Sequence, residues 1–186
     1  MFKVFKGGQS PTRGTKYSAC VDLYAREDVT IGAGETRLIP LGVCIDLNET
    51  IIKIMVGEYI RNNKDRYLNF DEVKGIVLSS HYLQLMLRSS LSKELIIANG
   101  VGVIDLDYKD EIMVRVHKPI PVGIDLTPLG NKRRFSVLQD KIKIKKGQRV
   151  AQITLLEHKS YLFGIDTEDE RTGGFGSTNK KDGKNG

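Results

Sequence analysis

The sequence predicts an all-β fold of the sandwich or jelly-roll type. Most of its expected elements are short, alternate apolar with polar residues, and are separated by glycine or proline, a pattern typical of antiparallel sheets. The chain has 186 residues, which is long enough for one domain with a real hydrophobic core. Its residues are 40% hydrophobic and 28% charged, a balance typical of soluble globular proteins, and no apolar run approaches the length of a membrane span.

The first expected strands are short and follow one another closely. We expect strands at residues 1–4, 19–25, 29–35 and 36–47. A glycine turn separates the last two, and Pro40 and Gly42 interrupt the final one as a bend or bulge would. Asp22 stands in the apolar second strand, so its carboxylate needs a partner to offset desolvation: either a nearby arginine or a metal-bound water.

Residues 48–81 differ from the strands around them, because their ends are apolar and their middle is highly charged. Asn69 or Asp71 is suited to cap a short helix, but the hydrophobic pattern does not separate helix from strand here. Two interpretations stay open for this segment. It is either a solvated excursion without a function or a segment that binds another protein.

Arg88, Ser89 and Ser90 follow the next expected strand, at residues 82–87. The bend that they form opens a short helical turn, in which the serine hydroxyls are available as caps. Because N–H groups and hydroxyls point outward from such a turn, it is suited to phosphate oxygens.

The pattern of residues 99–116 predicts a β-hairpin, because apolar residues alternate with other residues on both sides of a polar centre. The open backbone N–H and C=O groups of such a hairpin can bind the edge of a planar ring. Asp105 presents a carboxylate beside that ring, and Tyr108 can cover whatever lies between them. The alternative is an ordinary surface hairpin with acidic turn residues.

The last third of the chain contains one regular and two irregular segments. Residues 119–141 are expected to be irregular, with proline-containing turns and a basic run at 132–134, whereas residues 142–155 predict strand, turn and strand. Residues 166–186 have the composition of a flexible terminus. Phe175 stands there among glycines, a serine and a threonine, a combination that can wrap a phosphate while the ring stacks.

The charge and the cysteine content narrow the class of protein. The net charge of +6 favours an anionic partner, either nucleic acid or a polyphosphate small molecule. Cys20 and Cys44 lack metal-ligand spacing, so we expect buried or half-buried free thiols of an intracellular protein. The three histidines are scattered, and no zinc site is expected. The N-terminus lacks the apolar segment of a signal peptide, and a cytoplasmic location is expected.

Five segments of the chain, between residues 19 and 178, resemble in order the five motifs of the trimeric dUTP pyrophosphatases (dUTPases). Residues 99–108 read Asn-Gly-Val-Gly-Val-Ile-Asp-Leu-Asp-Tyr and resemble the third motif, Asn-x-x-Gly-Val-Ile-Asp-x-Asp-Tyr. The other matching segments are residues 19–25, 88–90, 147–152 and 171–178. The chain has Cys20 and Val21 where the family pattern has Gly and Tyr, Leu87 where it has Pro, and Gln148 where it has Asp. Arg171 is one residue nearer to Phe175 than the family pattern places its arginine.

The resemblance implies a role for each matched residue. Asp105 would be the general base that activates the attacking water, and Asp22 would help to hold the water shell of a Mg²⁺ ion. Tyr108 would exclude a ribose 2′-hydroxyl, and Phe175 would stack on uracil. The implied substrate-binding residues are Arg88, Ser89, Ser90, Asn99, Gly102, Val103, Ile104, Tyr108, Gln152, Arg171, Phe175, Gly176, Ser177 and Thr178.

The resemblance also implies an architecture and a reaction. The subunit would be a distorted jelly roll in a homotrimer with shared active sites. Residues 1–165 would form the β domain, with insertions at 48–81 and 119–141, and residues 166–186 would form a glycine-rich arm. Water would attack the α-phosphorus of dUTP with the help of Mg²⁺, giving pyrophosphate and the dUMP needed for thymidylate synthesis. No membrane and no specific nucleic acid partner is expected.

Two alternatives stay open. A dCTP deaminase of the same fold would use a catalytic glutamate, for which Glu111 is the acidic residue nearby. A regulatory protein would instead act through residues 48–81, by binding a repressor or another protein partner. The insertions favour a phage or viral member of the family, which would work in the host cytoplasm.

Overall fold

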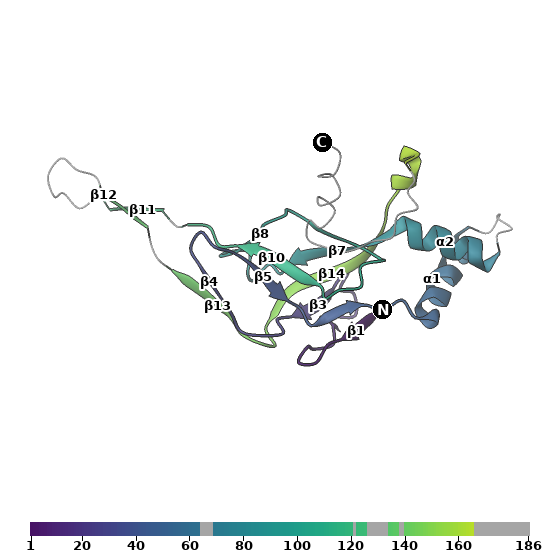
Figure 1. The fold of residues 1–186 in the computed structure, drawn as a ribbon, viewed down its shortest axis with the longest axis horizontal. Coiled ribbons are helices and arrows are strands. Elements are labelled where there is room, and N and C mark those ends of the chain that lie inside the picture. The colour runs from purple at the N-terminus through teal and green to yellow at the C-terminus, as the bar shows by residue number, and fades with distance from the viewer. Residues whose placement is uncertain (64–68, 121, 126–133, 138–139, 166–186) are drawn as a thin grey trace, which may run out of the picture.

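A computed structural model describes residues 1–63, 69–120, 122–125, 134–137 and 140–165 of the chain. All strand pairings in these residues are antiparallel, and the strands form five sheets. The described residues also contain two α-helices and one 3₁₀-helix (Figure 1). The prediction of an all-β fold is therefore confirmed. The helices lie at one end of the molecule and the β11–β12 ribbon lies at the other, with the main sheets between them (Figure 1).

The largest sheet has the strand order β2-β3-β14-β7-β9. Its strands are β2 (Thr12–Arg13), β3 (Val21–Tyr24), β14 (Arg149–Glu157), β7 (His81–Leu87) and β9 (Gly102–Asp105). The long strand β14 stands at the centre and pairs with β7 from Ala151 to Glu157. The short strand β9 is one of the two edge strands, so among the described residues it has a neighbouring strand on one side only.

The second sheet has the order β5-β10-β8, and three further pairs complete the fold. Its strands are β5 (Thr36–Pro40), β10 (Met113–His117) and β8 (Ile96–Ile97). The pairs are β1 (Phe2–Val4) with β6 (Val43–Ile45), β13 (Lys141–Ile144) with β4 (Val29–Gly32), and β11 (Val122–Asp125) with β12 (Arg134–Val137).

One hydrophobic core joins the two larger sheets. Strands of both sheets turn alternate residues inward, as a sandwich requires. On β10, Val114 and Val116 are buried, whereas Met113 and Arg115 between them are half-buried. The single core cluster contains Leu23, Leu83 and Ile153 of the first sheet together with Ile39, Val114 and Val116 of the second.

Residues 48–81 form a pair of helices, α1 (Glu49–Asn62) and α2 (Phe70–Ser80). The Asn48 side chain accepts the Ile51 N–H at the start of α1. The Asn69 side chain accepts the Glu72 N–H, and the Glu72 carboxylate accepts the Asn69 N–H, which makes a complete capping box. Asn69 rather than Asp71 is therefore the cap of α2. The capping contacts identify these residues as helical, which the hydrophobic pattern alone did not decide.

The predicted hairpin over residues 99–116 is wrong in its pairing. β9 pairs with β7, whereas β10 pairs with β5 and β8, so the two strands belong to different sheets. Gly102 lies so close to β7 that a Cβ atom added there would lie 2.8 Å from the Leu85 Cβ. Ile112 is hydrogen-bonded to the other side of the sandwich, to Val43 and Leu41. The segment therefore crosses from one sheet to the other instead of folding back on itself.

Residues 119–141, which the sequence predicts to be irregular, contain two paired strands. Within residues 119–141, β11 and β12 pair in register from Val122 opposite Val137 to Asp125 opposite Arg134. The prediction of strand, turn and strand for residues 142–155 is confirmed, with Gly147 at φ +77° in the turn. Cys44 is buried and Cys20 half-buried, and both are free thiols, as predicted.

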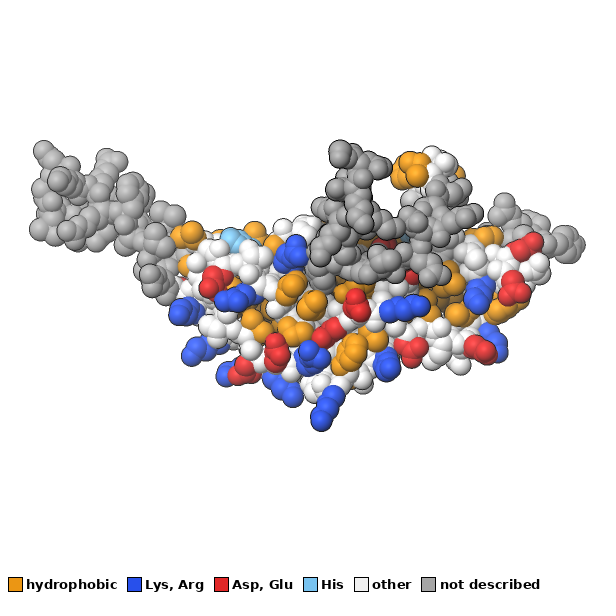
Figure 2. Space-filling view, viewed as in Figure 1, with side chains coloured by type: hydrophobic (Ala, Val, Ile, Leu, Met, Phe, Trp, Pro, Cys, Tyr) orange, Lys and Arg blue, Asp and Glu red, His pale blue; other side chains and the backbone are white. Residues whose placement is uncertain are grey.

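Charged side chains of both signs are interspersed over the face seen in Figure 2, rather than gathered into one basic patch. In the described part of the chain, neither α-helix combines the length and the apolar character needed to cross a membrane.

Asn69→Ala should lower the free energy of unfolding by about 1 kcal/mol, because it removes the side-chain acceptor for the first turn of α2. Urea unfolding of both proteins measures the difference. Asn62→Ala is the matched control, since Asn62 is the exposed last residue of α1 and the cap at that end is Asn63. An equal loss in the control would contradict the capping explanation.

Candidate active site

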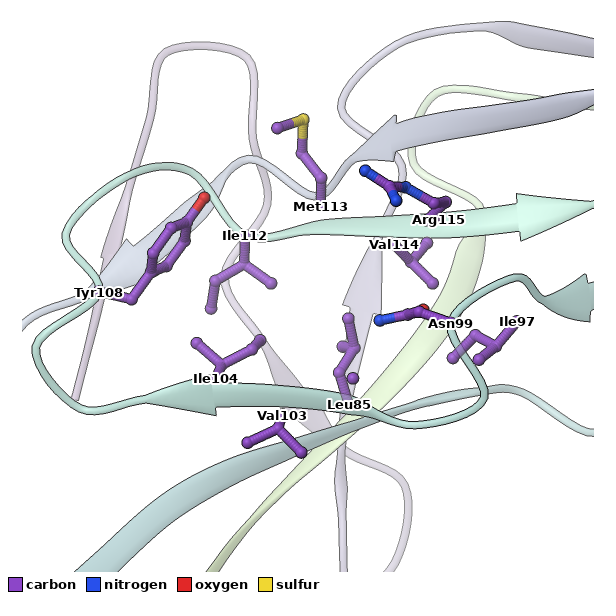
Figure 3. A pocket seen from close by; sticks show the side chains of 11 residues that line it. Leu85, Ile97, Asn99, Val103, Ile104, Tyr108, Ile112, Met113, Val114 and Arg115 are labelled. Carbon is purple, nitrogen blue, oxygen red and sulfur yellow. The ribbon is translucent and has the colours of Figure 1, made fainter. Parts of the chain in front are cut away.

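A cavity of about 180 Å³ lies between β9 and β10, where the two strands diverge (Figure 3). The predicted substrate residues that line it are Asn99, Gly102, Val103, Ile104 and Tyr108. The Ile104 and Ile112 side chains face each other across the gap, and the loop from β9 to β10 carries Tyr108 at one end (Figure 3). The structure therefore brings the residues predicted from the third motif into one pocket.

The pocket combines apolar walls with backbone groups that can form hydrogen bonds. Leu85, Ile112 and Val114 line it and belong to the buried core. The edge strand β9 forms one wall of the pocket, and its Ile104 side chain points toward β10 while Val103 points away (Figure 3). A flat ring can thus insert between apolar side chains and meet backbone N–H and C=O groups at its rim. Sequence reasoning did not single out Leu85 or Ile112, because each reads as an ordinary core residue.

Tyr108 is held in place on this wall. Only 8% of its surface is exposed, and its phenol O–H donates to the Glu111 carbonyl oxygen at 3.1 Å. Its N–H donates to the carbonyl oxygen of Asp105 at 3.1 Å, closing a turn at the end of β9. Asp105 itself is exposed. The turn therefore joins Tyr108, whose buried ring lines the pocket, to Asp105, which is exposed and follows the pocket-lining Ile104 without lining the cavity itself.

A second group of predicted residues gathers around Asp22, which is only 7% exposed. Its Oδ2 atom lies 3.3 Å from the Arg88 Nη1 and 3.2 Å from the Arg149 Nη1. Gln152 is the residue opposite Asp22 on β14. The partner expected for the buried Asp22 is thus arginine, and in fact two arginines. Arg149 was not selected from the sequence, although it matches the fourth motif beside Gln152.

Ser89 and Ser90 are exposed in the turn that follows Arg88. The backbone here is fixed at both ends, since the Arg88 N–H donates to the Val150 carbonyl oxygen and the Leu91 N–H donates to the Arg88 carbonyl oxygen. The turn therefore presents two hydroxyls next to a guanidinium, as the prediction of a phosphate site requires.

The two groups lie at opposite ends of β7. Asp105 is opposite Tyr82 near the start of the strand, and Arg88 follows its last residue, Leu87. Arg88 is six positions after Tyr82 along this extended chain, which corresponds to about 20 Å. Within one chain the Asp105 carboxylate and the Arg88 turn therefore cannot both contact neighbouring atoms of a small ligand.

The described residues contain no cluster of three or more His, Cys, Asp or Glu side chains suited to hold a metal ion. Asp22 Oδ2 is occupied by the two arginines, which leaves Oδ1 to accept a hydrogen bond from a metal-bound water. This donor set fits a Mg²⁺ held by phosphate oxygens and water rather than by several protein carboxylates.

The predicted residues Arg171, Phe175, Gly176, Ser177 and Thr178 lie outside the described residues. Their roles stay predictions, as does the division at residue 165.

Comparison with curated proteins finds a relative that is similar over most of both chains. Deoxyuridine 5′-triphosphate nucleotidohydrolase of Rickettsia prowazekii is 32% identical over 179 residues, which span 92% of this chain and 88% of that protein. The chain belongs to the dUTPase family. No family model matches the sequence.

Solved dUTPase structures share the fold. The dUTPase of Streptococcus mutans superposes with a TM-score of 0.53 at 20% identity, over 89% of this chain and 98% of that one. A point mutant of the dUTPase from Staphylococcus aureus phage phi11 gives a TM-score of 0.54 at 16% identity, over 95% and 97% of the two chains. That phage dUTPase coordinates a structural Mg(II) ion. The likeness places the pocket and the arginine pair on a dUTPase fold.

Asp22→Asn should lower the free energy of unfolding by about 1–3 kcal/mol, because Arg88 and Arg149 lose the carboxylate that they share. Urea denaturation measures the change. Asp28→Asn is the control, since Asp28 forms an exposed ion pair with Lys145 and its loss should matter much less. Equal losses in the two variants would contradict a special role for the buried carboxylate.

Proposed function

We propose that the protein hydrolyses dUTP to dUMP and pyrophosphate. The observation that carries this proposal is the pocket between β9 and β10: five residues predicted to bind the nucleoside line it, and Asp105 follows directly at its end. Membership of the dUTPase family supports the same reaction.

The pocket suits a uracil base and a deoxyribose. Uracil would lie between the apolar side chains, and its carbonyl and N–H groups would bond to the open backbone of β9 and to the Asn99 amide. The sugar would lie against the Tyr108 ring, which leaves no room for a 2′-hydroxyl. Val103 and Gly102 would contribute backbone rather than side chain.

Asp105 would act as the general base. Its carboxylate is exposed, so a water molecule can reach it. The water oxygen adds to the α-phosphorus, its proton passes to the Asp105 carboxylate, and the bond from the α-phosphorus to the bridging oxygen breaks to release pyrophosphate.

The phosphates would be bound by the turn after β7. Arg88 and the hydroxyls of Ser89 and Ser90 supply charge and donors, and Gln152 lies beside them on β14. A bound Mg²⁺ would neutralise phosphate charge, with Asp22 Oδ1 holding one of its waters. Arg171 and Phe175 of the arm would close over the nucleotide, with Gly176, Ser177 and Thr178 beside them.

The separation of about 20 Å along β7 supports a site shared between copies of the chain. The nucleotide bound beside Asp105 would meet the Arg88 turn of a neighbouring subunit. Val101 and Val103, which are 50% and 61% exposed next to the pocket, would be covered by that neighbour. We therefore propose a homotrimer in which each site takes residues from more than one subunit.

The deaminase alternative is disfavoured by the contacts of Glu111. Its Oε1 accepts the Gly42 N–H at 2.7 Å, and its Oε2 lies 3.0 Å from the Arg26 Nη2. Both oxygens are therefore engaged in holding the fold and are not directed at a substrate. A protein-binding role for residues 48–81 stays a prediction.

Asp105→Asn should reduce dUTP turnover at least about a thousandfold and change nucleotide affinity less than about tenfold, because the amide keeps the shape but cannot take the proton. Pyrophosphate release and binding of a non-hydrolysable dUTP analogue measure the two effects. Asp110→Asn, at an exposed residue of the same loop, is the control and should retain full turnover. Substantial turnover by Asp105→Asn would place the base elsewhere.

Asp105→Asn and Arg88→Gln subunits, each nearly inactive alone, should regain activity when refolded together. A mixed trimer contains sites that combine an intact Asp105 from one subunit with an intact Arg88 from another. Differently tagged subunits verify that mixed trimers form. If they form and activity stays at the parental level, the two residues act within one chain.

A further inference from the structure

We propose that Glu111 is a positioning residue that holds the Tyr108 ring rigid and thereby sets the preference for deoxyribose over ribose. The inference rests on the proposed function, since it concerns the sugar side of the same pocket. Glu111 does not line the cavity, and it would act through Tyr108 alone.

The Glu111 side chain is anchored at both oxygens. Its carboxylate receives the Gly42 N–H and pairs with the Arg26 guanidinium, and the side chain is only 17% exposed. A hydrogen bond from a backbone N–H and an ion pair, both partly buried, hold a carboxylate more firmly than an exposed ion pair does. The backbone of residue 111 is thus tied through its own side chain to the loop between β5 and β6 and to Arg26.

The anchor itself cannot shift easily. Gly42 has φ +69°, and a Cβ atom added there would lie 2.5 Å from the Gly8 Cα, so its backbone is packed against a second chain segment. The Gly42 carbonyl oxygen accepts the Phe5 N–H at 2.9 Å, and the Arg26 N–H donates to the Pro40 carbonyl oxygen at 2.9 Å. The direction of the Gly42 N–H toward Glu111 is therefore fixed by the fold.

The anchored residue supports the ring directly. The carbonyl oxygen of Glu111 accepts the Tyr108 O–H at 3.1 Å. The next residue, Ile112, donates its N–H to the Val43 carbonyl oxygen at 2.8 Å and is fully buried. The phenol thus bonds to a backbone segment that is held by the Glu111 side chain on one side and by the core on the other.

Rigidity matters because the difference between the two sugars is one hydroxyl. If the Tyr108 ring could move by a fraction of an ångström, the pocket would admit the 2′-oxygen of ribose, whereas a fixed ring excludes it. Loss of the anchor should therefore weaken selection between dUTP and UTP more than it weakens hydrolysis of dUTP.

The test compares kcat/KM for dUTP with kcat/KM for UTP in the full-length protein. Glu111→Ala should lower this ratio by about tenfold or more, mainly through a lower KM for UTP, with kcat for dUTP changed less than about threefold. Glu111→Gln keeps an oxygen for the Gly42 N–H and should restore most of the ratio. Glu35→Ala is the matched control, since Glu35 likewise accepts a glycine N–H and pairs with Arg37, but away from the pocket, and its ratio should not change.

Tyr108→Phe gives a second variant that leaves Glu111 untouched and removes only the phenol oxygen. It should also lower the ratio, and combining it with Glu111→Ala should add little, because both changes release the same ring. An unchanged ratio in Tyr108→Phe, or in folded Glu111→Ala, would overturn the inference while leaving dUTP hydrolysis intact. Absence of dUTP hydrolysis by the unaltered protein would overturn the proposed function and the inference together.

Discussion

The candidate site depends on one constraint, namely that Ile112 forms its backbone hydrogen bonds with a different sheet from the one that Gly102 joins. Were β9 and β10 paired, their backbone groups would satisfy each other and the space between them would be filled. Because Ile112 is bonded to Leu41 and Val43, the strands diverge, and within the described residues β9 has a neighbouring strand on one side only. An exposed edge is ordinarily an aggregation risk, but here it lines a pocket in which a flat ring can take up its donors and acceptors.

The central strand β14 organises the other half of the site. Its pairing with β3 brings Gln152 opposite Asp22, and its pairing with β7 brings Ala151 opposite Leu87, the residue before Arg88. Register in an antiparallel sheet is fixed over its whole length by which residues face the core, and Ile153 and Leu85 are both buried in it. Core packing around Ile153 thus sets the positions of polar groups at the strand ends, so the site is a consequence of the fold's register.

The sequence predicted most strands because alternation and glycine turns are local signals, and it located the pocket residues because they form one contiguous motif. It failed where the deciding contact is distant along the chain. Residues 99–116 look like a hairpin, and that pairing is excluded by contacts with distant strands, namely β10 with β5 and β9 with β7, together with the bonds from Ile112 to Leu41 and Val43. The two helices of residues 48–81 were missed for another reason: their local caps, Asn48 for α1 and the capping box of Asn69 and Glu72 for α2, are weak signals in strongly charged surroundings. The pairing of Arg149 with Asp22 joins residues that only the sheet brings together.

The arrangement around Asp22 also explains how a phosphate site can be prepared before a ligand arrives. Two guanidinium groups share one carboxylate, so the group keeps a net positive charge for an anionic ligand. Long arginine side chains lose rotamer freedom when they are fixed, a cost of up to about 2 kcal/mol each. Since Asp22 is buried in the sheet and holds both, that cost is met when the chain folds rather than when the ligand binds. In the proposed phosphate site, the salt bridge to Asp22 would therefore both stabilise the fold and orient Arg88 toward its ligand.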